Sequence, residues 1–140
     1  MYVSSRISQA MKALVFLLVS TLAFVGNSQA QISDSIYSCR GKVDQDQNRL
    51  IILNMQFKLG GLTIEGDLNG DPIVGSNFGS GNFVQAVAYP KSQSTGNVSD
   101  IKHKMTANVN QQDGQFNLTI VGVHGHSFFL SGRGQCQIQN

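Results

Sequence analysis

Apolar and polar residues alternate along much of this chain, and a period of two is typical of half-buried β-strands. The clearest runs cover residues 53–59, 104–110 and 116–120. Clusters of Gly, Asn and Asp lie between such runs, at residues 44–48, 60–61, 69–72, 79–82 and 112–114. These residue types favour the tight turns of antiparallel hairpins, because they tolerate positive φ or hydrogen-bond locally. The sequence therefore predicts an all-β domain.

The predicted strands cover residues 36–43, 50–59, 62–68, 83–89, 103–110, 115–123 and 126–138, with a weaker signal at 72–76. Seven or eight short strands favour a small antiparallel β-barrel, and a β-sandwich is the alternative. Four glycines fall inside the apparent strands, where they favour the bulges and bends of barrel corners. They are Gly122, Gly125, Gly132 and Gly134. No helix of useful length is expected after Ala30.

Residues 11–30 have the three parts of a secretory signal peptide. Lys12 supplies the positive start, residues 13–25 the apolar stretch, and residues 28–30 a small-x-small cleavage site. We expect residues 1–30 to be removed, with Gln31 as the first mature residue and residues 31–140 as a single β domain. The sequence leaves open whether translation starts at Met1 or Met11. The apolar stretch is too short for a comfortable membrane span, so a secreted or periplasmic protein without a membrane anchor is expected.

Two cysteines, Cys39 and Cys136, lie near the two ends of the expected mature chain. In an exported protein such a pair favours a disulfide over two free thiols. A disulfide between them would bring the first predicted strand to the last, which is the geometry of a closed barrel. The chain-entropy model gives a stabilisation on the order of 4 to 5 kcal/mol for so long a loop.

Charge argues against a nucleic-acid partner. The full chain has ten basic and eight acidic residues, and loss of Arg6 and Lys12 with the signal peptide would leave the mature part formally neutral. The remaining basic residues are scattered and form no stripe that could follow a phosphate backbone. A monomer without a strong electrostatic preference for its partner is expected.

Three histidines give the one hint of metal chemistry. On a continuous strand, His124 and His126 would lie on the same face, about 6 to 7 Å apart. His103 could approach from a neighbouring strand and complete a three-nitrogen zinc site of the catalytic type. The alternative is a hairpin turn at Gly125, from which the two imidazoles diverge. We favour the turn, and therefore expect no metal and no other cofactor.

Acidic residues suggest two further kinds of site, a calcium loop and a glycosidase carboxylate pair, but neither sequence pattern is complete. Residues 67–71 and 44–48 alternate oxygen ligands as calcium loops do. The glycine of the first comes too early, whereas the second has Arg49 where the turn glycine belongs and Met55 at its twelfth position. Glu65 and Asp67 lie too close along one strand to flank a glycosidic bond from opposite sides. No Ser-His-Asp or Cys-His arrangement stands out. We therefore expect Asx-rich turns, solvated carboxylates and no enzymatic activity.

The early Tyr37-Ser38-Cys39 segment and the late second cysteine resemble the membrane-bound and periplasmic C-type lysozyme inhibitors, whose tied barrel presents a loop to the enzyme's cleft. The inhibitory Ser-Gly-x-x-Tyr segment has no counterpart, because residues 131–134 lack the aromatic. Lipocalins and avidins are similar in expected shape, but this chain contains no Trp. The sequence assigns no family.

Three functions stay open. The first is binding of a small ligand in the barrel interior or mouth, where Phe57, Phe83, Phe116, Phe128 and Phe129 could supply apolar surface. The second is an interaction or inhibitor module of the cell envelope, acting on an extracellular protein through the segments 69–82 and 90–100. The polar segment 89–100 is expected to be a mobile loop. The third is a zinc enzyme using the three histidines. We favour non-enzymatic binding.

Overall fold

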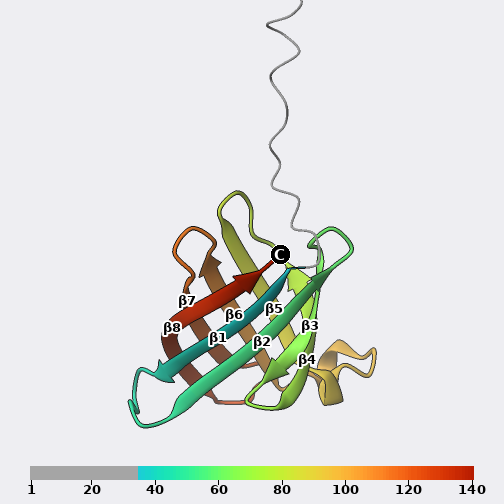
Figure 1. Cartoon of the computed structure of the whole chain (residues 1–140). Coiled ribbons are helices and arrows are strands. Elements are labelled where there is room, and N and C mark those ends of the chain that lie inside the picture. The colour runs from blue at the N-terminus through green and yellow to red at the C-terminus, as the bar shows by residue number, and fades with distance from the viewer. Residues whose placement is uncertain (1–34) are drawn as a thin grey trace, which may run out of the picture.

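The computed structural model describes residues 35–140, which form a closed antiparallel β-barrel (Figure 1). The eight strands are β1 (Ile36–Val43), β2 (Leu50–Lys58), β3 (Thr63–Leu68), β4 (Asp71–Asn77), β5 (Phe83–Pro90), β6 (His103–Asn110), β7 (Gln115–Gly122) and β8 (Phe129–Gln139). Each strand pairs with the next along the chain, and β8 pairs with β1. The predicted barrel is confirmed, and the sandwich alternative is wrong. The predicted signal peptide, residues 1–30, lies outside the described residues.

Two strands differ from their predictions. The weak signal at residues 72–76 corresponds to a full strand, β4, with seven residues. The last strand begins at Phe129 rather than at residue 126, because residues 123–126 form a tight turn. In that turn His126 N donates to Val123 O over 3.1 Å, and φ is 54° at His124 and 85° at Gly125.

The core occupies the barrel interior, because every second side chain of a strand points inward. Aromatic residues of β1, β2 and β7 supply the bulk, and alanines of β5 and β6 are the small members that allow the interior to be filled. The largest buried rings are those of Tyr37, Phe57 and Phe116, and the buried alanines are Ala86, Ala88 and Ala107.

Two short 3-10 helices, η1 (Lys91–Gln93) and η2 (Val98–Asp100), lie in the connection between β5 and β6. Among residues 35–140 there is no helix with the length and apolar character to cross a membrane.

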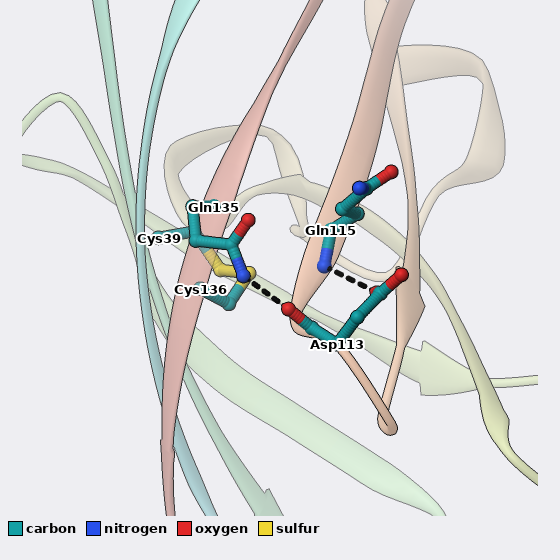
Figure 2. The surroundings of a disulfide bond; sticks show 5 residues. All are labelled: Cys39, Asp113, Gln115, Gln135 and Cys136. Carbon is teal, nitrogen blue, oxygen red and sulfur yellow. Dashed lines mark hydrogen bonds between the residues drawn. A yellow bond between two sulfur atoms is a disulfide. The ribbon is translucent and has the colours of Figure 1, made fainter.

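The predicted disulfide joins the first and last strands of the barrel. Cys39 of β1 and Cys136 of β8 are direct partners in the ladder that closes the sheet, and 97 residues separate them in the sequence. Both cysteines are buried. Beside the bond, Gln135 donates from its side chain to the carbonyl of Asp113, whose carboxylate accepts from Gln115 N over 2.9 Å (Figure 2). The turn between β6 and β7 is thereby attached to the seam.

Glycines in the seam permit close approach of β1 and β8 and do not form bulges. The register of β8 with β7 and with β1 runs through Gly132 and Gly134 without a break, so the predicted bulges at these two positions are wrong. Gly134 faces Gly41 directly. A Cβ on Gly134 would overlap the carbonyl of Arg40 and come within 2.4 Å of Gly41 Cα. The pair therefore needs glycine for space rather than for positive φ.

Candidate functional site

The two ends of the barrel are built differently. Connections in an up-and-down barrel alternate between its ends, so residues 44–49, 69–70, 91–102 and 123–128 gather at one end, below in Figure 1. We call this the open end. Residues 59–62, 78–82 and 111–114 gather at the other, where β1 begins and β8 finishes. We call that the closed end.

Large side chains fill the closed end. The rings of Tyr37 and Phe57 pack with their centroids 4.8 Å apart, and Phe116 is buried with them in the core. Gln111, in the connection between β6 and β7, donates from Nε2 to the Tyr37 hydroxyl over 3.2 Å. Burial raises the pKa of Tyr37, and the hydrogen bond from Gln111 opposes that shift. Packed rings therefore occupy the barrel interior at this end.

At the open end lies a cavity of about 750 Å³. Its walls come from all eight strands or their connections, so it is the mouth of the barrel. The volume lies within the range of small-molecule sites, roughly 300 to 1,000 Å³. The core therefore occupies one part of the barrel and leaves the mouth open.

One side of the mouth is apolar. It is formed by β7, β8 and the end of β1, which lie side by side in the sheet, and its residues are Leu118, Ile120, Phe128, Leu130 and Val43. Phe128 is 42 % exposed although it lines the cavity. Its ring stands edge-on to that of His103, with the centroids 5.1 Å apart. An apolar ligand on this side would cover surface that the fold leaves in contact with water.

The other side of the mouth is mixed and carries the polar groups of the cavity. It runs from the start of β2 to the start of β6. Its polar residues are Arg49, Asn69, Asp71, Lys91, Ser92, Gln93 and His103, and its apolar residues are Ile51, Leu68, Pro72, Ile73 and Pro90. Asn69 is fixed in the two-residue turn between β3 and β4, where φ is 51° at Asn69 and 88° at Gly70. The backbone and the side chain of Asn69 both bind the backbone of Ile52. Asn69 N donates to Ile52 O over 2.7 Å, and Asn69 Oδ1 accepts from Ile52 N over 2.8 Å. The side opposite Phe128 thus has a defined, hydrogen-bonding surface.

The connection between β5 and β6 is organised by its own hydrogen bonds. Gln93 Oε1 accepts from Lys102 N over 2.8 Å and from His103 N over 3.3 Å, so one side chain links both ends of the connection. Thr95 Oγ1 donates to Asp100 Oδ2 over 2.7 Å. The polar composition of residues 89–100 predicted a mobile loop, and it did not reveal these bonds.

The three histidines do not form the proposed zinc site. His124 and His126 lie in the tight turn after β7, beyond the strand that was expected to align them. His103 is at the start of β6 and contacts Phe128. Among residues 35–140 no group of three His, Cys, Asp or Glu side chains could hold a metal ion. The structure instead contains the hairpin turn at Gly125, which the sequence offered as the alternative to a continuous strand.

The acidic residues considered from the sequence have structural partners. Asp67 accepts from Asn54 Nδ2 at 3.2 and 3.3 Å and from Gly70 N at 3.2 Å, and Asp46 accepts from Asn48 N at 3.1 Å. The bonds from Gly70 N and Asn48 N stabilise hairpin turns, and those from Asn54 join β2 to β3. Glu65 pairs with Lys58 Nζ at 2.6 Å, and this hydrogen bond is the main cause that lowers the pKa of Glu65.

Asp44 links the open end to the β1–β8 seam. Its carboxylate accepts from Ser131 Oγ over 2.8 Å and from Arg133 Nε over 2.9 Å. The hydrogen bond from Ser131, followed by that from Arg133, lowers the pKa of Asp44. These contacts fix the connection between β1 and β2, which places Arg49 at the mouth.

Sequence reasoning had not singled out Arg49 for binding, and it included Lys91 and Gln93 only as part of the segment 90–100, which was expected to contact a protein partner. Their signal is positional: each lies in a connection that belongs to the open end of an eight-stranded meander. That position follows from the sequence once β4 is counted as a strand.

No protein-family model matches this chain, and no curated protein or solved structure is significantly similar to it. The case for a function therefore depends on the mouth itself.

Proposed function

We propose that this chain is an exported, non-enzymatic binding protein that takes a small ligand in the mouth of its barrel. The observation that carries the proposal is the open-end cavity of about 750 Å³, which has one apolar side and one mixed side that carries its polar groups. Ligand sites of this kind combine apolar walls with a few oriented polar groups. The hydrogen-bonded Asn69 and Gln93 are such groups in this mouth.

Fluorescence titration with the neutral probe N-phenyl-1-naphthylamine tests this proposal. We expect saturable binding with a stoichiometry of one, because the proposal assigns the probe to a single mouth. The informative variant is Ile120→Trp, since Ile120 is a half-buried residue of the cavity wall. The matched control is Val121→Trp, which adds the same ring at the next position of β7, on the opposite face of the strand.

Ile120→Trp should weaken probe binding at least tenfold, whereas Val121→Trp should bind like the wild type. Circular dichroism of both variants establishes that they are folded. Absence of saturable binding to the wild type, or equal affinities of the two folded variants, would overturn the proposal. Should Ile120→Trp not fold, Phe128→Ala supplies the test, because removal of this exposed ring takes away part of the apolar side.

Export is the second part of the proposal. It is supported by the signal-like residues 11–30 and by the Cys39–Cys136 disulfide, which is typical of an oxidising compartment. Expression with the native N-terminal segment in an exporting host, followed by intact-mass measurement, tests it. The expected product begins at Gln31 and has the mass of the oxidised form. An uncleaved product that stays in the cytosol would contradict export.

A protein-interaction role is the second candidate, favoured by exposed apolar side chains at the closed end. Leu59, Leu62, Phe78 and Phe83 are each more than half exposed. Leu59, Leu62 and Phe78 lie in two connections, and Phe83 begins β5. The connections approach each other where Asn77 N, at the end of β4, donates to Leu62 O over 2.9 Å. Cross-linking in envelope extract, with Phe78→Ser/Phe83→Ser as the comparison, tests this role. A partner retained unchanged by the variant would exclude this surface as its docking site.

A further inference from the structure

The mouth of the barrel is divided into two chemically different arcs, and this division indicates what kind of molecule it accepts. The arc formed by β7, β8 and the end of β1 lines the cavity with aliphatic side chains and Phe128. The arc from β2 to β6 carries the polar and charged groups. A purely apolar ligand would strip water from the polar groups of the second arc without replacing their hydrogen bonds, which costs free energy. An amphipathic ligand satisfies both arcs.

Gln93 identifies the polarity of the head group. Its Oε1 is occupied by the amides of Lys102 and His103, so the group that remains for a ligand is the Nε2 donor. Gln93 is half-buried and lines the cavity. Within residues 35–140 its Nε2 has no protein partner and is open to solvent, since no unpartnered side-chain nitrogen or oxygen there is buried. A ligand that displaces water from this donor must supply an acceptor in its place.

The charges at the mouth favour an anionic acceptor over a neutral one. Two cations, Arg49 and Lys91, line the cavity together with a single carboxylate, Asp71. Neither cation has an ion-pair partner within 4 Å among residues 35–140, although Lys91 acts at longer range on Glu65. Lys91 and Gln93 belong to the same short helix, η1, so a cation and the free amide donor lie two residues apart. Charge-assisted hydrogen bonds at such a site are stronger than neutral ones.

We propose that the mouth binds amphipathic anions, with the apolar body against the β7–β8–β1 arc and the carboxylate, sulfonate or phosphate head at Lys91 and Gln93. Arg49 adds to the positive potential across the mouth. The proposal rests on the proposed ligand-binding function and specifies its ligand class. The carboxylate of Asp71 offsets one of the two positive charges, and it therefore limits how strongly the mouth prefers an anionic ligand over a neutral one.

A matched pair of probes tests the head-group preference separately from binding itself. The anionic 8-anilino-1-naphthalenesulfonate and the neutral N-phenyl-1-naphthylamine share one aromatic body and differ in the sulfonate. We expect the folded wild type to bind the anionic probe about five- to tenfold more tightly, as two partly screened cations allow. The preference should shrink as salt rises from about 20 mM to about 500 mM, because salt screens exposed charges.

The informative variant is Arg49→Gln/Lys91→Gln, which should bring the two affinities close together without changing that of the neutral probe. Its matched control is Arg40→Gln/Lys42→Gln, which removes the same charge from exposed positions of β1 outside the cavity and should keep the preference. Equal affinities in the wild type, or a preference that survives in the first variant, would overturn the anion proposal while ligand binding stands. Failure of both probes to bind would refute both proposals together.

Discussion

Reduction of the Cys39–Cys136 disulfide should lower the free energy of unfolding by about 4.7 kcal/mol. The bond closes a loop of 97 residues, and the chain-entropy model assigns about this value to a loop of that length. The effect acts on the unfolded chain, whose ends gain freedom when the bond opens. The native seam remains, because the ladder between β1 and β8 runs from Ile36 to Val43 with continuous register. The reduced protein should therefore stay folded with much smaller stability.

Urea unfolding of the oxidised and reduced forms at neutral pH measures this difference. The reduced form should unfold at a lower midpoint and with a steeper dependence on urea, because its unfolded state exposes more surface. The Cys39→Ala/Cys136→Ala variant provides a check without reductant. It should lose at least as much stability, since both sulfur atoms leave a buried position.

A reduced form within about 1 kcal/mol of the oxidised form would refute this reasoning. It would mean that the unfolded chain keeps its ends together without the bond. Alternatively, the bond would destabilise the native seam about as much as it destabilises the unfolded chain. Unchanged urea dependence together with a large stability loss would also contradict it. The loss would then lie in the folded barrel and not in the freedom of the unfolded chain.

Three further predictions concern single positions and are checked by the same unfolding measurements. Gly134→Ala should destabilise the barrel more than Gly60→Ala, because a Cβ on Gly134 meets the backbone of β1, whereas Gly60 has open space and pays only for its φ of 68°. Leu59→Asn should stabilise by about 0.5 to 1 kcal/mol, since Leu59 is 74 % exposed at a φ of 53° that asparagine tolerates better. Asp44→Asn should lose stability relative to wild type above about pH 4 and match it in stronger acid. The folded pKa of Asp44 is lowered, so its contribution is present above the unfolded pKa and disappears as pH falls through the folded value.

Most strands could be predicted because one face of each is buried in the same interior. Alternation is strongest where inward positions are occupied by large apolar residues, as in β2 and β7. In β4 the inward positions after Ile73 are Gly75 and Asn77, so the period of two is weak there. The start of β8 was misplaced for a related reason. Phe128 and Phe129 extend the apolar signal toward a turn that positive φ at His124 defines.

Recognising β4 as a strand affects more than that one element. In a meander, the number of strands determines at which end of the barrel every later connection lies. An antiparallel meander closes with antiparallel pairing of its first and last strands only when the number of strands is even. With seven strands, β1 and β8 would run parallel, and the connection at residues 91–102 would move to the end opposite residues 44–49. Cys39 lies near the start of the first strand and Cys136 near the end of the last, so they can meet only if these two strands are antiparallel. An even number of strands is then required, which argues for the eighth strand. That argument could have brought Arg49, Lys91 and Gln93 to one end from the sequence alone.

The hydrogen bonds of the mouth could not be predicted in this way. The contact between Gln93 and the two amides across its connection depends on the path of an irregular segment, which has no period to follow. The same holds for Asp44, whose partners Ser131 and Arg133 are distant in sequence. Strand pattern determines which residues share an end of the barrel, and side-chain bonds to irregular backbone then determine which of their groups remain free for a ligand.

The distribution of burial between the two ends explains how one small barrel could combine stability with binding. Tyr37, Phe57 and Phe116 are almost fully buried at the closed end, and the disulfide holds the seam. The mouth leaves Phe128 partly exposed and the amide donor of Gln93 without a partner among residues 35–140. The exposed part of Phe128 and the Gln93 donor face water in the free protein, so both remain available to a ligand. Because such a ligand would bind the folded barrel and not the unfolded chain, its free energy of binding would add to the stability that the closed end already provides.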